Sequence, residues 1–186
     1  MAEITSPPTR IIVRPLPSRG HAARLRIGAM DMPCALGRSG AVTIKREGDG
    51  GTPAARMQLL QLRTRRDRLP GPASAVASTP IRRRDGWCDD PRDGRYNRPV
   101  RLPLSASAET LWRQDRLYDV VGILDWNLRP RIRRLGSAIF LHLCHSGLQA
   151  TEGCIALRRA DLLRLLAVCG RRPVFDVAPP PRRLRR

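Results

Sequence analysis

Only one of the 35 basic residues is a lysine, Lys45, and only seven residues are aromatic. The sequence also lacks a run of eighteen apolar residues, which excludes a membrane-spanning helix. No secretory signal is visible in residues 1–8, because no basic stretch is followed there by an apolar core. The few aromatic residues are scattered, which argues against the stacking platforms of a single-stranded nucleic-acid binder.

The net charge of +19 is therefore almost entirely due to arginine. Guanidinium groups grip carboxylates and phosphates through two parallel hydrogen bonds, so this charge favours anionic partners such as an acidic polymer or a carboxylate-bearing peptide. GC-rich codon usage would produce the same excess without any partner. The basic residues do not gather on one predicted helix or strand face, which argues against nucleic acid.

Five cysteines leave at least one thiol unpaired within a monomer; they are Cys34, Cys88, Cys144, Cys154 and Cys169. An odd number is compatible with a catalytic thiol and argues against a scaffold built purely from disulfides. We expect Cys34 and Cys88 to be small buried hydrophobic residues and Cys169 to belong to the core face of a helix.

The length of 186 residues predicts a single domain. We expect a disordered lead over residues 1–9, one folded domain over 10–177 and a Pro/Arg-rich tail over 178–186. Short apolar runs separated by Gly and Pro predict a mainly β fold. The expected strands are 11–13, 24–27, 34–36, 42–44, 57–62, 117–124, 137–141, 155–157 and 173–177, with antiparallel hairpins among the early ones and a short helical turn over 111–117.

The most informative stretch runs from Gly136 to Gly170. It predicts a buried strand over 137–141 with His142 at its end, then a turn-rich loop and a brief strand. A helix follows, whose leucines share one face and whose C-terminal cap is Gly170. Cys154 lies in the loop between the two predicted strands.

This loop has the residue types of a cysteine nucleophile with a histidine partner. A thiol attacks a carbonyl as the thiolate, so it needs a neighbouring base, and backbone N–H groups must be free to hold the oxyanion. Gly153 lets a substrate carbonyl approach the backbone closely. His142 lies twelve residues before Cys154 and could fold back to it.

These residues resemble the L,D-transpeptidases of the YkuD-like fold, in which an upstream His precedes Ser/Thr-His-Gly-Cys and an apolar residue. Here the corresponding text is His142 and then Thr151-Glu152-Gly153-Cys154-Ile155. Three further segments also match the family, in order along the chain: Gly37 to Gly40 (Gly-Arg-Ser-Gly), Lys45 to Pro53, and Gly86 to Asp90 (Gly-Trp-Cys-Asp-Asp).

The resemblance implies a YkuD-like β-sandwich or barrel of mixed strands, with one helix after the catalytic cysteine. It implies attack by Cys154 on an anionic peptidoglycan stem peptide, with His142 as proton acceptor and donor and Gly153 in the oxyanion hole. Thr151, Glu152, Tyr96 and Arg158 would contact substrate, and Leu143 would orient His142 through its carbonyl. No cofactor or metal is implied, and a periplasmic or cell-envelope location would be expected.

The chain departs from the family at Glu152, where most members have His, and at Ala55, where relatives usually have Gly. A carboxylate beside Cys154 would raise the pKa of the thiol unless Arg158 or Arg159 neutralises it. Three alternatives stay open: hydrolysis by the same fold, as in an L,D-carboxypeptidase, a zinc site built from His142, Cys144, His145 and Cys154, and a non-catalytic polyanion binder.

Overall fold

The computed structural model describes residues 9–17, 20–145 and 147–180. Residues 1–8 of the predicted lead and residues 181–186 of the predicted tail lie outside this part. The elements are β1 (Arg10–Pro15), β2 (Ala22–Ile27), β3 (Met30–Ala35), β4 (Ala41–Val42), β5 (Thr52–Pro53), β6 (Arg56–Thr64), β7 (Ser78–Pro80), β8 (Asp85–Cys88), β9 (Arg98–Arg101), β10 (Ala108–Thr110), β11 (Val120–Leu124), β12 (Phe140–Leu143), β13 (Ile155–Leu157), α1 (Arg159–Val168) and β14 (Val174–Val177).

The main sheet closes on itself into a barrel of mixed strands. Its strand order is β11-β12-β13-β3-β2-β1-β14-β6, and β6 pairs in turn with β11. Most pairs are antiparallel, but β12 runs parallel to β13 and β1 runs parallel to β14. Closure leaves no free edge in the ring, and β7 extends the sheet from β6. The mainly β prediction is confirmed, and the structure is a barrel.

The alternation of the early strands places their apolar residues inside the barrel. In β2, Ala23, Leu25 and Ile27 are buried and the two arginines between them are exposed. Strand residues with a period of two project to opposite faces, so one face of β2 joins the core and the other meets solvent. The predicted half-exposed strand over 24–27 is therefore confirmed.

The single helix packs beside the barrel wall through one face. Leu162, Leu165 and Leu166 are fully buried in it, as is Cys169 just after it. Gly170 follows with a φ of 69°, a left-handed conformation that glycine adopts without strain. Both the helix and its glycine terminator follow the sequence pattern.

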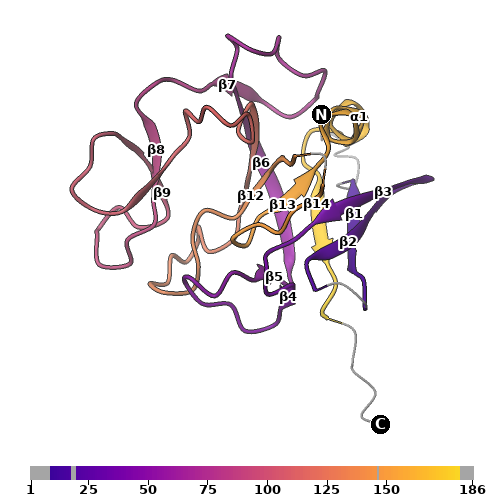
Figure 1. Cartoon of the computed structure of the whole chain (residues 1–186), viewed down its shortest axis with the longest axis horizontal. Helices are drawn as coiled ribbons and strands as arrows, with labels where there is room; N and C mark the ends of the chain where they lie inside the picture. The colour runs from indigo at the N-terminus through magenta and orange to yellow at the C-terminus, as the bar shows by residue number, and fades with distance from the viewer. Residues whose placement is uncertain (1–8, 18–19, 146, 181–186) are drawn as a thin grey trace, which may run out of the picture.

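A second layer of chain lies outside the barrel (Figure 1). It contains the three-stranded sheet β10-β8-β9, whereas the small parallel pair β4-β5 forms a separate sheet beside the barrel (Figure 1). A second apolar cluster fills the space under this layer, and it includes Trp87, Phe140 and Cys154. The predicted hairpins hold for β2 and β3, but the prediction is wrong for β4, which pairs in parallel with the distant β5.

Two predicted strands begin later in the structure than the sequence indicated. The strand predicted over 137–141 is β12, which begins at Phe140, because Gly136 and Ala138 have positive φ and interrupt the extended chain. His142 thus lies inside the strand. The strand predicted over 117–124 begins at Val120, after a turn at Arg116, whose φ is 66°.

The helical turn predicted over 111–117 is absent; the segment consists of bends and turns. The carbonyl of Arg113 accepts hydrogen bonds from the guanidinium groups of Arg65 and Arg68, at 2.8 and 3.2 Å. Tertiary contacts from the loop that follows β6 therefore hold this segment.

Candidate active site

The neighbouring parallel strands β12 and β13 bring His142 and Cys154 together. Leu141 pairs with Ile155 and His142 with Ala156, so Cys154 lies at the start of β13 beside Phe140. Leu141 and Leu143 point into the barrel core, whereas Phe140 belongs to the outer cluster with Cys154. Because strand residues alternate, His142 projects on the same outer side as Phe140. The barrel wall thus presents both groups to the second layer.

The Cys154 sulfur is held by backbone groups of the chain just before and within β12. Phe140 N–H donates to Sγ at 3.4 Å, and the thiol donates to the carbonyl of Ala138 at 3.3 Å. Burial raises the pKa of the thiol to about 12, and the Glu109 carboxylate adds to the rise. The resting sulfur is therefore a protonated thiol.

The His142 ring is held through its Nδ1 atom, which lies 2.7 Å from the carbonyl of Leu143. A carbonyl only accepts, so Nδ1 carries the proton and Nε2 keeps its lone pair. Burial lowers the pKa of His142 to about 4, so the imidazole is neutral. The contact with the Leu143 carbonyl is the one expected from the resemblance.

Tyr118 covers the other side of the imidazole. Its ring lies edge-on to His142, with 5.2 Å between ring centroids, and its hydroxyl donates to the carboxylate of Glu109. Burial is the main cause that raises the pKa of Glu109. The neutral thiol of Cys154 and the neutral imidazole of His142, whose Nε2 keeps its lone pair, therefore line the same cavity.

The turn before Cys154 packs backbone against backbone. Gly153 has a φ of 133°, and a Cβ there would lie 2.9 Å from the carbonyl oxygen of Gly51. A Cβ on Gly37 would lie 2.1 Å from the carbonyl oxygen of Gly50. Neither position has room for a side chain. The Gly153 N–H donates to the Thr151 hydroxyl at 3.2 Å, which in turn donates to the Cys154 carbonyl at 2.8 Å.

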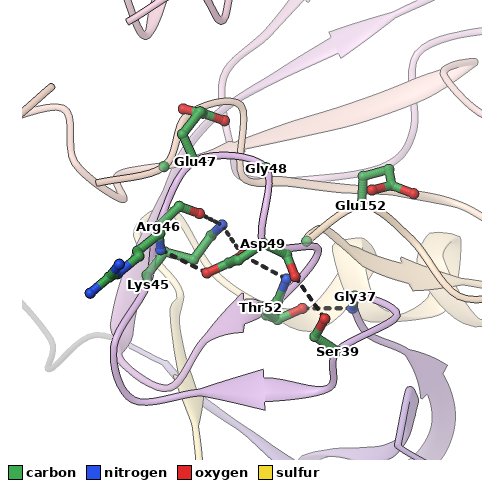
Figure 2. A network of polar contacts seen from close by, with 12 residues as sticks. Gly37, Ser39, Lys45, Arg46, Glu47, Gly48, Asp49, Thr52 and Glu152 are labelled. Atoms are coloured by element: carbon green, nitrogen blue, oxygen red, sulfur yellow. Dashed lines mark hydrogen bonds and ion pairs between the residues drawn. The ribbon is translucent and has the colours of Figure 1, made fainter. Parts of the chain in front are cut away.

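The segment from Lys45 to Pro53 supports this turn (Figure 2). The buried Lys45 ammonium donates to Asp49 Oδ1 at 2.5 Å and to the Arg46 carbonyl at 2.6 Å. Burial opposes ionisation of Asp49, but these bonds and those from the Arg46 and Gly51 N–H groups lower its pKa. Thr52 then links the segment to the nucleophile by donating to the Cys154 carbonyl at 3.3 Å.

Glu152 is an exposed residue that forms an ion pair with Arg38 of the Gly-Arg-Ser-Gly turn. The partner that pairs with Glu152 is thus Arg38, from the loop after β3, and it is not one of the two arginines considered from the sequence, Arg158 and Arg159. Backbone contacts reinforce this arrangement: Arg38 N–H donates to the Thr151 carbonyl at 2.8 Å and Thr151 N–H donates to the Leu36 carbonyl at 2.9 Å.

His142 and Cys154 open into a cavity of about 390 Å³ between the barrel and the outer layer. Thr151 and Glu152, which the resemblance assigns to substrate binding, also line it, and their contact with substrate stays a prediction. Tyr96 and Arg158 are not among its lining residues. Tyr96 is buried with its hydroxyl on Glu47, and Arg158 is exposed at the N-terminus of α1. Their predicted contacts with substrate stay predictions.

The charge of this cavity is the reverse of the chain's charge. Its lining contains the carboxylates of Glu47, Asp89, Glu109 and Glu152 but only one guanidinium, that of Arg113. Asp89 Oδ1 is buried and has no hydrogen-bond partner among the described residues. Glu109, Arg113 and Tyr118 also line the cavity, and their place there was not predicted from the sequence. The local sequence feature that could have indicated them is the concentration of Glu, Trp, Arg and Tyr over 109–118. From this segment the sequence had predicted a helical turn over 111–117.

The proposed zinc ligands are not assembled into a metal site. Among residues 9–17, 20–145 and 147–180, no group of three or more His, Cys, Asp or Glu side chains is placed to hold a metal ion. His145 is exposed at the rim of the cavity, while Cys34, Cys88 and Cys169 are buried as expected.

All four segments of the sequence resemblance converge on Cys154. The turn at Gly37 packs against Gly153, Thr52 binds the Cys154 carbonyl, and Trp87 packs edge-on against Phe140 with 5.3 Å between centroids. In agreement with this arrangement, the family profile of the YkuD L,D-transpeptidase catalytic domain matches residues 10–175. The chain belongs to the YkuD family. Members of this family act on peptidoglycan and are typically associated with the cell envelope.

No match was found among curated proteins. Within the described part of the chain, no helix has the length and apolar character that a membrane span requires.

Proposed function

We propose that the protein is an L,D-transpeptidase. Cys154 Sγ attacks the amide carbonyl carbon on the carboxyl side of an L-configured centre in a peptidoglycan stem, as in diaminopimelate. The C–N bond breaks, D-alanine leaves with its amine, and a thioester remains on Cys154. An acceptor amine then displaces the sulfur and forms the new amide. The observation that supports this most directly is the opening of Cys154 and His142 into one cavity of a YkuD domain.

His142 acts as base and then as acid. Its Nε2 lone pair takes the thiol proton during attack and delivers it to the leaving amine, while Nδ1 stays bonded to the Leu143 carbonyl. The high pKa of Cys154 and the low pKa of His142 keep both groups neutral until substrate displaces the thiol from the Ala138 carbonyl. The Cys154 N–H is the main oxyanion donor, because the Gly153 N–H already binds Thr151.

Arg113 binds a carboxylate of the donor stem. It is the only guanidinium among the cavity-lining residues, and its side chain lies 5.0 Å from the centroid of the Tyr118 ring. Asp115 holds part of this guanidinium, and the remaining donors suit a planar carboxylate. Arg158 is the alternative that the resemblance suggested.

An amine is the preferred acceptor. Four carboxylates line the cavity of a strongly basic protein, and one of them, Asp89, has a buried oxygen without a partner among the described residues. An ammonium group supplies the donors that such an oxygen lacks, whereas a neutral water gains much less from these charges. Transfer to an amine is therefore favoured over the hydrolysis of an L,D-carboxypeptidase.

Intact-protein mass spectrometry with a carbapenem, a covalent mimic of the donor in this family, tests the nucleophile. We expect a single adduct on the wild-type protein, no adduct on Cys154→Ala and slower formation on His142→Ala. Cys144→Ala is the matched control, because Cys144 also lines the cavity, and it should react like the wild type. An adduct that survives in Cys154→Ala and disappears in Cys144→Ala would overturn the assignment.

The fate of the thioester tests the acceptor. With a tetrapeptide donor and a D-amino acid amine, the products of aminolysis and hydrolysis are separated and their ratio is measured. We expect Asp89→Asn to lower this ratio with little change in donor consumption, and Asp31→Asn, an exposed site on β3, to leave it unchanged. Hydrolysis as the main wild-type reaction at millimolar amine would instead indicate a carboxypeptidase.

A further inference from the structure

A second pocket, of about 400 Å³, lies between β6 and the outer three-stranded sheet. It shares no lining residue with the Cys154 cavity. Three guanidinium groups line it, from Arg63 on β6, Arg95 on the loop between β8 and β9, and Arg101 on β9. The only carboxylate in the lining is that of Asp85. This pocket therefore has the opposite charge to the active-site cavity.

The carboxylate of Asp85 satisfies only part of these donors, and Asp93 accepts from the Nε and Nη2 atoms of Arg95 at 2.8 and 2.7 Å. Arg101 Nη1 lies 2.5 Å from Asp85 Oδ1, and Arg63 Nη1 lies 3.8 Å from Asp85 Oδ2. Arg63 Nε is buried and has no hydrogen-bond partner among the described residues. A buried donor without a partner costs about 1–3 kcal/mol, so such a group calls for an explanation. A bound acceptor would provide one.

The rest of the wall is apolar and closely packed. Pro99, Val100 and Leu111 line it, and a Cβ on Gly86 would lie 2.9 Å from Leu102 Cγ, so the floor has no room for another side chain. Apolar walls lower the local dielectric constant and strengthen any charge-assisted hydrogen bond made inside. This effect applies most to Arg63, whose side chain is 21% exposed, because the Arg95 and Arg101 side chains are more than half exposed at the rim.

We propose that this pocket binds a tetrahedral oxyanion of the phosphate class, either as the free ion or as a phosphomonoester. A carboxylate is planar and is satisfied by one guanidinium fork, whereas the donors here come from three chain segments. A phosphate has oxygens in several directions and can bind all three groups at once. Arg63 donates to one of these oxygens, and Arg101 and Arg95 bind the others at the rim through the N–H groups that Asp85 and Asp93 leave free.

Titration calorimetry with inorganic phosphate, with ionic strength held constant by chloride, tests the site. We expect saturable one-to-one binding that weakens about tenfold in Arg63→Gln, the loss of one hydrogen bond to a charged group. The matched control is Arg164→Gln, an exposed arginine on α1 that removes the same charge. The control should bind like the wild type. Equal weakening in both variants would show diffuse attraction to a basic protein and overturn the proposal.

Asp85→Asn should change the phosphate affinity in the opposite direction to Arg63→Gln. Damage to the fold would weaken binding and could not produce this increase. Removing the one carboxylate of the pocket should tighten phosphate binding several-fold, and unchanged or weaker binding would refute the site. Acetate tests the geometry: affinity equal to that of phosphate would overturn the tetrahedral assignment. Cys154→Ala should bind phosphate normally, so the two proposals fail independently.

Discussion

His142 should make the stability of the protein fall as the pH drops below neutrality. Its pKa in the folded protein is about 4 because the ring is buried, against an ordinary value of 6.5. Between these values the unfolded chain binds a proton that the folded chain does not, so the free energy of unfolding decreases with decreasing pH. From pH 7.5 to 4.5 the loss amounts to about 2.5 kcal/mol from this one group.

Urea unfolding followed by tryptophan fluorescence at several pH values measures this effect. The comparison is between the wild type and His142→Gln, because every other ionisable side chain is the same in both proteins. The wild type should lose about 2.5 kcal/mol more than the variant over this range. Equal losses in the two proteins would refute the reasoning and show that the imidazole is protonated in the folded state at an ordinary pH.

Two further substitutions test the packing and the charge of the site. Gly37→Ala should destabilise the protein by about 3 kcal/mol, because its Cβ would overlap the Gly50 carbonyl, while Gly94→Ala, with no atom within 4 Å, should be nearly neutral in thermal unfolding. Arg113→Gln should raise KM for the tetrapeptide donor about tenfold with a smaller change in kcat, and Arg158→Gln should leave KM unchanged; the opposite result would favour the residue at the helix terminus.

The fold was predictable where local pattern and tertiary structure agree. The alternation in β2 and the leucine face of α1 both follow from the period of the element, so their positions were found from the residues alone. Strand ends were less predictable. The run over 137–141 is apolar throughout, but Ala138 adopts a positive φ that places its carbonyl against Cys154, and no local propensity indicates that contact.

The site was predictable from its motifs but not from its electrostatics. Cys154 and His142 are marked by a local sequence, whereas Glu109, Arg113 and Tyr118 reach the cavity from a loop whose shape depends on Arg65 and Arg68. Pairing between distant segments is equally hidden from the sequence. The ion pair of Glu152 with Arg38 joins residues more than a hundred positions apart, and charge alone suggested nearer partners.

The neutral resting state of Cys154 also determines which chemicals can damage the protein. Peroxides and simple alkylating agents react with thiolates, and a pKa of about 12 leaves roughly one sulfur in 10⁵ ionised at pH 7. Sulfenic acid formation at this cysteine is consequently slow compared with that at an exposed cysteine of ordinary pKa. The sulfur reacts well only with an electrophile that fits the cavity and displaces the thiol from the Ala138 carbonyl. The burial of Cys154 therefore limits both its oxidation and its reaction with small electrophiles.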